Sequence, residues 1–580
     1  MTLQTVDEVV CVDFEFISSD GEHPRPVCFV ARELKSGKVY RQWVETEAPA
    51  EPPFAHGPNT LVVAYYNAAE MSCYLALGWP LPRLTADLYV LFREATNGLL
   101  LPHGRGLLGA LRWFGHDSVD VLYKDAMQKR VLQGPPYSAD EQNAILNYCQ
   151  SDVDALLVLL PHLIGPATEL TLPVIRAEFM KCLAEIEWRG IPVNSALYGS
   201  MVEHWPELRA KAIDRINRVI PVYERGSFRS ALFEAWLEGR DWLRNWPRTP
   251  GGCLSLDEET FDQQSAIHPE LIPLHQTRQM LGQMKQPGLA VGADGRNRCM
   301  LSGYSTVTSR CAPSTAKYIF GAPSWARSLI QPEPGKALIY ADWSAQEVGI
   351  AGVLSGDTAL QNAYRSGDPY ITFAKVVKAV PDYATDKTHP EIRNLYKQTV
   401  LQSQYSITAA GLSRKLNIAP TEAQSLLDQH RQVYSTYWRW NDSVSDYIQL
   451  QGELQTMYGW RMLYRDGTNL RTARNFLLQA TGSEMLRLAC SYAAREHIEV
   501  VATIHDALMV EADESDVEDV AMATQQVMQR ASETVLQGFA LRSEAKKIRH
   551  PDYYVDKRGV EMWDWMVQKL TELNGNSSAA

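Results

Sequence analysis

The stretches ALIYADWSAQE (337–347) and VVATIHDALMVEA (500–512) are the most informative about the fold, because each places an aspartate beside an apolar run. The runs predict two buried strands, with Asp342 ending the first and Asp506 at the tip of a tight hairpin. A buried aspartate is costly unless another group offsets its charge. Two such acids from distant segments can hold two hard divalent cations. Taken separately, each aspartate is equally consistent with an ordinary strand-end or turn residue.

Length and composition describe a large globular protein. The 580 residues suffice for about four domains, and 45% of them are hydrophobic. We expect no membrane-spanning segment or secretory signal, and the nine scattered cysteines indicate neither disulfides nor a zinc site. A cytoplasmic location fits best. The net charge of −12 disfavours nucleic-acid binding without excluding it, because such binding needs only a locally basic surface.

The segment HPEIRNLYKQTVLQSQY (389–405) predicts a helix with Pro390 at its first position. Four residues recur at four-residue spacing on one broad face: Arg393, Lys397, Leu401 and Tyr405. Two cations followed by an aromatic suit a triphosphate and its base, since arginine and lysine bind phosphate oxygens strongly. The alternative is a solvated basic face with Tyr405 in the core.

A second helix is predicted from about 470 to 497. It carries Arg471, Asn475 and Gln479 at four-residue spacing. Such donors suit the DNA minor groove, whose acceptors are nearly independent of sequence. An exposed polar stripe is the alternative.

The N-terminal stretch VVCVDFEF (9–16) predicts a strand with Asp13 and Glu15 on one face. A helix over 143–160 places Tyr148 and Asp152 on a common face. Two acids among apolar residues require a cation. The alternative is a strand-end acid pair beside an unrelated amphipathic helix.

Residues from about 300 to 512 resemble the polymerase domain of DNA polymerase I-like (family A) enzymes in the order and spacing of five motifs. These motifs are Thr308-Ser309-Arg310, Asp342 to Glu347, Arg393/Lys397/Tyr405, Arg471/Asn475/Gln479 and His505-Asp506. The resemblance implies a right-hand architecture of palm, fingers and thumb. It implies DNA synthesis from dNTPs on primer–template DNA by two-metal phosphoryl transfer, in DNA replication.

The resemblance also implies roles for individual residues. Two Mg²⁺ ions, with Mn²⁺ as an alternative, would be held at Asp342, Trp343 and Asp506. Catalysis would rest on both aspartates with Arg393 and Lys397. The implied nucleotide site comprises Glu347, Arg393, Lys397, Leu401, Tyr405 and His505. The implied DNA contacts are Arg310, Arg471, Asn475 and Gln479. Glu347 would exclude a 2′-hydroxyl.

The sequence departs from the family pattern at several positions. Leu401 stands where the family usually has Phe or Tyr, so discrimination against dideoxy substrates does not carry over. Trp343 replaces the usual Tyr, Ser406 the usual Gly, and Ala507 an acid. None of these departures removes a metal ligand.

The N-terminal segments resemble the DEDD-type 3′–5′ exonuclease domain of the same family, which is RNase H-like. Its implied metal ligands are Asp13, Glu15, Glu70 and Asp152, and Tyr148 would orient the attacking water. The family usually has the middle acid four residues after an Asn, whereas here Glu70 follows Asn67 by three. If Tyr66 fills the Asn position, Glu70 is the ligand. If Glu70 is misplaced, proofreading is weak or lost.

The expected fold class is therefore α/β and α+β multidomain. The expected domains are an exonuclease at 1–165, connector and thumb at 166–330, first palm part at 331–347, fingers at 348–450, and second palm part with C-terminal tail at 451–580.

The first metal acid is already Asp13, so we expect no preceding 5′-nuclease domain. The compact form resembles bacteriophage versions, which implies a monomer working in a bacterial host's cytoplasm. Two alternatives stay open: a single-subunit RNA polymerase-like enzyme, and an inactive DNA-binding replication factor.

Overall fold

The computed structural model describes residues 1–580 except 117–120, 250, 285–287, 314–316 and 578–580. The chain forms two compact units. Unit 1 comprises Met1–Gly190, Arg298–Ser314 and Gly335–Arg549, and unit 2 comprises Ile191–Asn297, Thr315–Pro334 and His550–Ala580. Among the described residues, no helix has both the length and the apolar character needed to cross a membrane.

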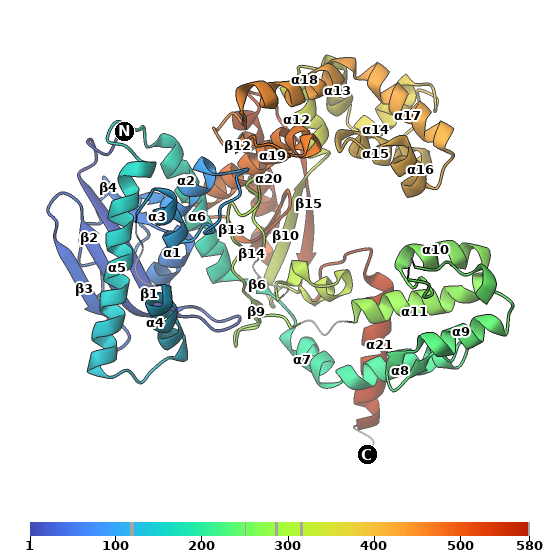
Figure 1. Ribbon diagram of the computed structural model, residues 1–580, viewed down its shortest axis with the longest axis horizontal. Coiled ribbons are helices and arrows are strands. Elements are labelled where there is room, and N and C mark those ends of the chain that lie inside the picture. The colour runs from blue at the N-terminus through green and yellow to red at the C-terminus, as the bar shows by residue number, and fades with distance from the viewer. Residues whose placement is uncertain (117–120, 250, 285–287, 314–316, 578–580) are drawn as a thin grey trace. The chain divides into compact units, whose positions relative to one another are not determined.

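The N-terminal part of unit 1 is built on a five-stranded sheet in the order β3-β2-β1-β4-β5 (Figure 1). Its strands are β1 (Glu8–Ile17), β2 (Arg25–Glu33), β3 (Val39–Trp43), β4 (Thr60–Ala64) and β5 (Leu84–Asp87). The central strand β1 pairs antiparallel with β2 and parallel with β4. All five residues of β4 are buried, as parallel pairing on both of its edges requires. The strand predicted over 9–16 is confirmed.

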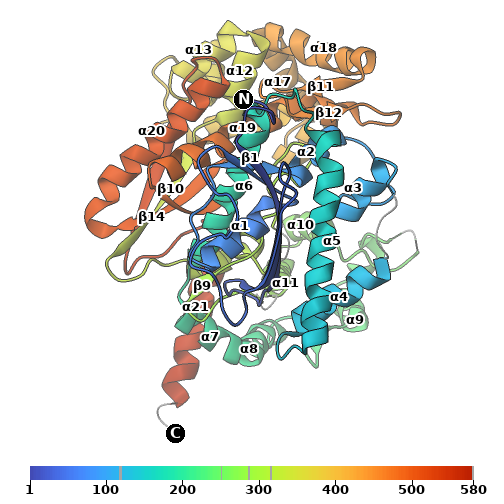
Figure 2. The same ribbon diagram turned by 90° about the vertical axis from the view of Figure 1, so that its left-hand side faces the viewer.

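Six helices surround this sheet: α1 (Asn67–Ala76), α2 (Leu88–Ala95), α3 (Leu107–Trp113), α4 (Val121–Gln133), α5 (Ala139–Leu163) and α6 (Thr171–Arg189). Helix α5 contacts β1 and β2 and runs beside the strands in Figure 2. It begins at a capping box in which Ser138 and Glu141 satisfy each other's backbone N–H groups. Helix α1 packs on β1 and α6. The helix predicted over 143–160 is confirmed within α5.

A four-stranded antiparallel sheet in the order β13-β14-β10-β15 forms the other centre of unit 1. Its strands are β10 (Lys336–Trp343), β13 (Glu499–Ile504), β14 (Ala507–Asp513) and β15 (Ser543–Arg549). Helices α19 (Leu470–Arg495) and α20 (Val517–Val535) pack together and against this sheet. Both predicted strands are confirmed, and so is the hairpin.

Between β10 and α19 the chain is almost entirely helical (Figure 1). The helices are α12 (Gln346–Ser355), α13 (Thr358–Arg365), α14 (Pro369–Val376), α15 (Pro390–Gln404), α16 (Ala409–Leu416), α17 (Pro420–Val433) and α18 (Ser435–Gln451). A short hairpin follows, made by β11 (Glu453–Gln455) and β12 (Arg461–Leu463). The helix predicted over 389–405 is confirmed, with Tyr405 as its C-cap rather than its last helical residue.

Unit 2 is mostly helical. Its helices are α7 (Ser195–Glu203), α8 (Trp205–Asn217), α9 (Ser230–Glu238), α10 (Glu258–Ile267), α11 (Ile272–Gln283) and α21 (Val560–Ser577). Two strand pairs complete it: β6 (Ile191–Pro192) with β9 (Arg296–Asn297), and β7 (Tyr223–Glu224) with β8 (Ser227–Phe228). An aromatic core contains Phe233, Trp246 and Phe261.

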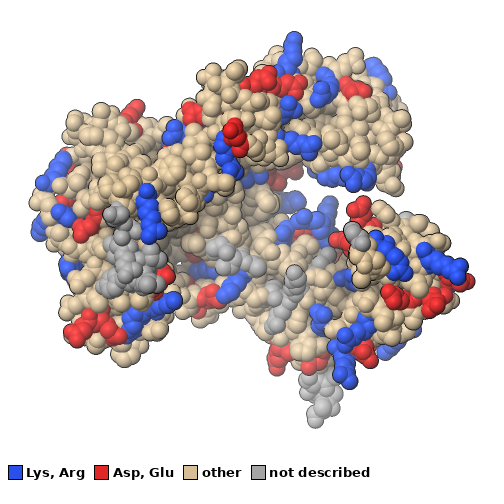
Figure 3. All heavy atoms as spheres, viewed as in Figure 1, with Lys and Arg blue, Asp and Glu red and all other residues tan. Residues whose placement is uncertain are grey.

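Charged side chains of both signs are mixed over the face in Figure 3. The net charge of −12 therefore does not describe a uniformly acidic surface.

Candidate active sites

Strands β10 and β14 bring Asp342 and Asp506 together from distant parts of the sequence. In the antiparallel register, Asp342 lies opposite Ala507, the residue directly after Asp506. The hairpin between β13 and β14 turns over two residues, and His505 adopts the positive φ of 54° that such tight turns favour. Asp342 and Asp506, called the aspartate pair below, thus lie side by side.

The aspartate pair is electrostatically unfavourable without a cation. Burial and the neighbouring charge of Asp506 raise the pKa of Asp342 to about 7. Burial also raises the pKa of Asp506. Oδ1 of Asp342 is buried and has no hydrogen-bond partner among the described residues. Carboxylate oxygens in this state suit a hard divalent cation, so the residues present fit the metal ions that the sequence predicts.

Arg310 faces the same region. Its positive charge opposes the effect of burial on the pKa values of Glu347 and Asp506, which places the guanidinium near both. With His505 and Ser309, Arg310 lines a cavity of about 50 Å³. The aspartate pair is therefore bordered by a fixed positive charge.

The segment that carries Arg310 is irregular, and side chains from elsewhere in unit 1 hold it in place. They donate to the carbonyl oxygens of residues 304–307 and 309, and the donors are Arg93, Asn97, Trp460 and Arg487. Arg487 also bonds the Ser309 hydroxyl at 2.9 Å. Ser309 has a φ of 60°, a conformation that needs such support in a non-glycine residue. The position of Arg310 is thus set by tertiary contacts.

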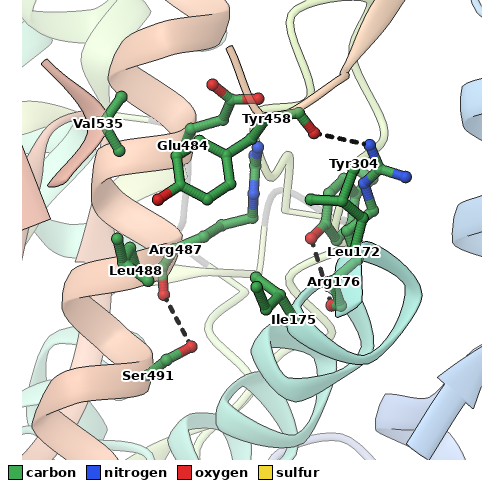
Figure 4. Close-up of a pocket in the computed structure, with 10 residues that line it drawn as sticks. All are labelled: Leu172, Ile175, Arg176, Tyr304, Tyr458, Glu484, Arg487, Leu488, Ser491 and Val535. Atoms are coloured by element: carbon green, nitrogen blue, oxygen red, sulfur yellow. Dashed lines mark hydrogen bonds between the residues drawn. The ribbon is translucent and has the colours of Figure 1, made fainter. Parts of the chain in front are cut away.

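A small cavity between α6 and α19 lies beside this segment (Figure 4). Its volume is about 30 Å³, which is room for a water molecule and too little for a nucleotide. Glu484 lines it, and burial raises the pKa of this carboxyl to about 7. In Figure 4 Arg176 donates to the carbonyl oxygen of Tyr458. We interpret the cavity as part of the support for the Arg310 segment.

Three predicted site residues meet at the C-terminal end of α15. The Tyr405 hydroxyl donates to Oε1 of Glu347 at 2.5 Å, and Nε2 of Gln479 donates to that hydroxyl at 3.2 Å. Tyr405 is 37% exposed, so the alternative that places it in the core is wrong. Arg471 is exposed in the first turn of α19, about 12 Å along the helix from Gln479. Asn475, half-way between them, is only partly buried.

The two cations of α15 lie over one aromatic ring. The Arg393 guanidinium is 5.5 Å and the Lys397 ammonium 5.9 Å from the centre of the Tyr370 ring. Arg393 Nε also donates to Oδ2 of Asp368. Leu401, one turn further along α15, is partly buried.

Sequence reasoning missed Asp368 and Tyr370. Asp368 caps α14 by accepting from the backbone N–H groups of Tyr370 and Ile371, and Pro369 occupies the first helical position. The sequence Asp368-Pro369-Tyr370 is typical of a helix start, with an aspartate N-cap followed by a proline. Nothing in that pattern indicated that the capping carboxylate also binds Arg393.

The N-terminal part of unit 1 gathers a second set of carboxylates, called the N-terminal acid cluster below: Asp13 and Glu15 on β1, Glu70 on α1 and Asp152 on α5. Ligand atoms of Asp13, Glu15 and Cys149 lie within 4.8 Å of one another. After burial, the charges of Asp13 and Glu15 are the largest causes that raise the pKa of Glu70. Glu70 therefore lies beside them.

The start of α1 explains how Glu70 reaches this position. Asp87, at the end of β5, accepts from the backbone N–H groups of Tyr66 and Asn67 at 3.1 and 2.7 Å. Tyr66 has a φ of 77° and is the N-cap of α1. These bonds fix the first helical residue as Asn67, so that Glu70 sits in the first turn, 4% exposed.

Burial dominates the electrostatics of the N-terminal acid cluster. Burial, and then the charge of Asp152, raise the pKa of Asp13 to about 8. The pKa values of Glu15 and Glu70 are raised well above their usual range, also mainly by burial. Oδ2 of Asp13 and Oε2 of Glu70 are buried without a partner among the described residues. These oxygens fit hard cations as ligands.

Tyr148 and Lys124 complete the surroundings of Asp152. Tyr148 lies one turn before Asp152 on α5, and its hydroxyl donates to that carboxylate. Nζ of Lys124 donates to both Asp152 oxygens at 2.7 Å each. Lys124 was missed because it lies on another helix, 28 residues away, where spacing carries no signal.

Comparisons with known proteins agree with the four-stranded sheet and the helices around it. Residues 321–544 match the family model described as DNA polymerase family A. DNA polymerase I of Chloroflexus aurantiacus is 28% identical over 217 residues, which is 35% of this chain and 23% of the relative. The thermostable DNA polymerase I of Thermus aquaticus is 26% identical over 211 residues, 34% of this chain and 25% of the relative.

A solved structure matches over most of the chain. It is the POL domain of Pol1 from M. smegmatis in complex with DNA primer-template and dNTP, with a TM-score of 0.69 and 18% identity over 94% of this chain and 96% of that one. This likeness concerns the fold. The chain spans about a quarter of the length of the curated relatives that it matches.

Proposed function

Because the chain carries a DNA polymerase family A region and has the fold of a family A polymerase domain, we propose that it synthesises DNA from dNTPs on a primer–template. The observation that carries this proposal is the aspartate pair, partly buried and adjacent, with Asp342 on β10 and Asp506 directly before β14. Support also comes from the two cations of α15, which suit a triphosphate.

In this proposal the carboxylates of Asp342 and Asp506, with the backbone carbonyl oxygen of Trp343, would hold two Mg²⁺ ions. When bound, the ions stabilise negative charge on the reacting phosphate and assist attack by the primer 3′-oxygen. Arg393 and Lys397 bind the triphosphate and stabilise the departing pyrophosphate.

The remaining predicted residues select and hold the substrates. Glu347, fixed by the Tyr405 hydroxyl, lies under the incoming sugar and excludes a 2′-hydroxyl. Leu401, Tyr405 and His505 border the nucleotide. Four donors contact the minor groove of the primer–template: Arg310, Arg471, Asn475 and Gln479.

The test of synthesis is primer extension with Mg²⁺ and dNTPs. We expect Asp342→Ala and Asp506→Ala each to abolish extension while the chain stays folded by circular dichroism. Undiminished extension in either variant would refute the proposal. Incorporation of rNTPs in preference to dNTPs would favour the RNA polymerase alternative, and duplex binding without turnover would favour an inactive DNA-binding factor.

We further propose a 3′–5′ exonuclease that removes the terminal nucleotide for proofreading. The N-terminal acid cluster supports it, because it gathers four buried or partly buried carboxylates, of which Asp13 and Glu70 each have a buried oxygen without a partner among the described residues, and such a set fits two Mg²⁺ ions. The β3-β2-β1-β4-β5 sheet is consistent with an RNase H-like domain. Tyr148 would orient the attacking water. We expect Asp13→Ala to stop 3′ degradation of single-stranded DNA and to leave synthesis intact; equal degradation by the variant would overturn this assignment.

The domain assignment is part of the same proposal. It places the exonuclease at 1–165, connector and thumb at 166–330, palm at 331–347 and 451–580, and fingers at 348–450. The protein would act as a cytoplasmic monomer.

A further inference from the structure

Lys124 places a positive charge directly on the N-terminal acid cluster. Its ammonium donates to both oxygens of Asp152 at 2.7 Å and lies 5.5 Å from the centre of the Tyr148 ring. The side chains of Lys124 and Asp152 are 20% and 11% exposed, so little water competes for this pair. A lysine held this way is neither a solvated surface cation nor part of an apolar core.

The local structure fixes Lys124 at this place. Helix α4 packs against β1 and α5, the two elements that carry Asp13 and Asp152. Its C-terminal end is tied to the start of α5 by Arg130, which pairs with Glu141 at 2.6 Å and bonds the Gly134 carbonyl oxygen at 2.8 Å. Glu141 is also a member of the capping box of α5. The contacts that begin α5 therefore also orient α4.

The sum of the charges at the N-terminal acid cluster indicates a role for Lys124. The N-terminal acid cluster contains four carboxylates, which two divalent cations neutralise in full. A bound phosphodiester then adds one negative charge, which a further cation can offset. Among the described residues, Lys124 is the cation that hydrogen-bonds to the cluster. With metal ions on the carboxylates, its ammonium is available to the phosphate.

We propose that Lys124 is a catalytic residue of the 3′–5′ exonuclease that binds a non-bridging oxygen of the scissile phosphate. This inference rests on the proposed exonuclease function and adds a substrate-binding residue to it. In the reaction, water adds to phosphorus and the bond from phosphorus to the 3′-oxygen of the preceding nucleotide breaks. That oxygen takes up a proton and becomes the new 3′-hydroxyl, and the other product is a nucleoside 5′-monophosphate. Lys124 stabilises the charge that builds up on the phosphate oxygens.

The first experiment compares Lys124→Ala with Lys129→Ala in the full-length chain. Lys129 is an exposed lysine of the same helix and serves as the matched control. Under single turnover with saturating single-stranded DNA and Mg²⁺, we expect Lys124→Ala to lower the degradation rate about 10²-fold. Lys124→Arg should retain more of the rate because it keeps the positive charge. Primer extension should not change, and the variant should stay folded by circular dichroism at the assay temperature.

The outcomes separate this inference from the exonuclease proposal. If the wild-type chain does not degrade DNA, both the exonuclease proposal and the proposed role of Lys124 are wrong. If the wild-type chain degrades DNA, Asp13→Ala does not, and Lys124→Ala matches Lys129→Ala, only the role of Lys124 falls.

A second readout tells substrate binding from mere support of Asp152. Mn²⁺ binding is measured by electron paramagnetic resonance in a chain carrying Asp342→Asn and Asp506→Asn, so that the aspartate pair does not contribute. Because Lys124 competes with a metal ion for the Asp152 oxygens, Lys124→Ala should bind Mn²⁺ at least as tightly, whereas Asp152→Ala should bind it more weakly. A loss of Mn²⁺ affinity in Lys124→Ala equal to that in Asp152→Ala would overturn the proposal and leave Lys124 as a structural partner of Asp152.

Discussion

The N-terminal acid cluster and the aspartate pair both gather carboxylates beside a sheet, but their charges are offset differently. In the N-terminal acid cluster the ammonium of Lys124 bonds one of the acids, and the pKa of Asp13 rises to about 8. In the aspartate pair the charges of Lys546 and Lys397 partly offset burial, and the pKa of Asp342 rises to about 7. In the proposed exonuclease, bound metal ions would therefore have to offset most of the charge of the N-terminal acid cluster. The aspartate pair lies near two lysines, Lys397 and Lys546, whose charges act on Asp342 before any ion binds.

The largest effect that sharpens this comparison concerns the cations of α15. Arg393→Ala and Lys397→Ala should each lower kcat/KM for dNTP incorporation about 10²- to 10³-fold, because the leaving pyrophosphate loses a positive partner. Degradation of single-stranded DNA should stay within about twofold of wild type, as expected for an unrelated site. Steady-state primer extension and exonuclease assays measure both. Lys415→Ala, at an exposed lysine of α16, is the matched control; parallel losses of both activities would mean that the chain is misfolded.

Discrimination between dNTP and rNTP should depend on residues near the aspartate pair and not on the N-terminal acid cluster. Glu347→Ala should reduce discrimination between dNTP and rNTP by about 10- to 200-fold, because a closely fitted pocket gains room for one hydroxyl. Tyr405→Phe should give a smaller reduction, since it removes only the hydrogen bond that holds Glu347. Competitive incorporation on one template measures the ratio. Unchanged discrimination in Glu347→Ala would remove the steric role of this residue.

In the absence of metal ions, the pH dependence of the free energy of unfolding should differ between variants of the two sites. The folded-state pKa of Asp13 is about 8, whereas an unfolded aspartate has a pKa of about 3.9. Between these values the folded chain holds a proton that the unfolded chain has lost, so stability falls as the pH rises from about 4 to 8. Asp13→Asn, which mimics the protonated acid, should therefore stabilise the chain in EDTA at pH 8, by on the order of 2 kcal/mol.

Asp342→Asn should give a smaller gain, because the pKa of Asp342 rises only to about 7. Denaturant unfolding at pH 5 and pH 8, with and without Mg²⁺, measures both variants. For both variants, the gain in the free energy of unfolding over wild type should be smaller at pH 5 and in the presence of Mg²⁺. A gain of equal size at both pH values would point to packing rather than charge.

The smallest predicted effect concerns Tyr148. Tyr148→Phe removes the hydroxyl that bonds Asp152, so degradation of single-stranded DNA should slow about tenfold, the equivalent of one hydrogen bond of about 1.4 kcal/mol. DNA synthesis should not change. A variant that slows both activities alike would contradict the separation of the two sites.

Much of the fold could be predicted from the sequence alone. The strands that carry Asp13 and Asp342 and the helix beginning at Pro390 follow from apolar patterning and from a proline at a helix start, and each is confirmed. The tight hairpin at His505 and Asp506 follows from two apolar runs separated by two polar residues. Such features depend on neighbours within a few residues, and spacing along the chain records those neighbours directly.

Other features depended on how the elements pack. Residue spacing did not decide whether Glu70 lies beside Asp13. The start of α1 decides it, because Asp87 accepts hydrogen bonds from its first backbone N–H groups. From the sequence, Tyr405 was also compatible with a core position, whereas in the fold its hydroxyl donates to Glu347.

Which acids, cations and aromatics share a face of each helix or strand follows from the amino-acid order, because helix and strand periods are fixed by backbone geometry. Which of these residues contact one another depends on how the helices and strands pack. Lys124 on Asp152 and Asp368 on Arg393 are contacts between separate helices, and no repeat in the sequence encodes the distance between two helices. Those contacts arise because burial of apolar faces brings the helices together, and charged groups that are partly buried in the process are stable only when they are paired.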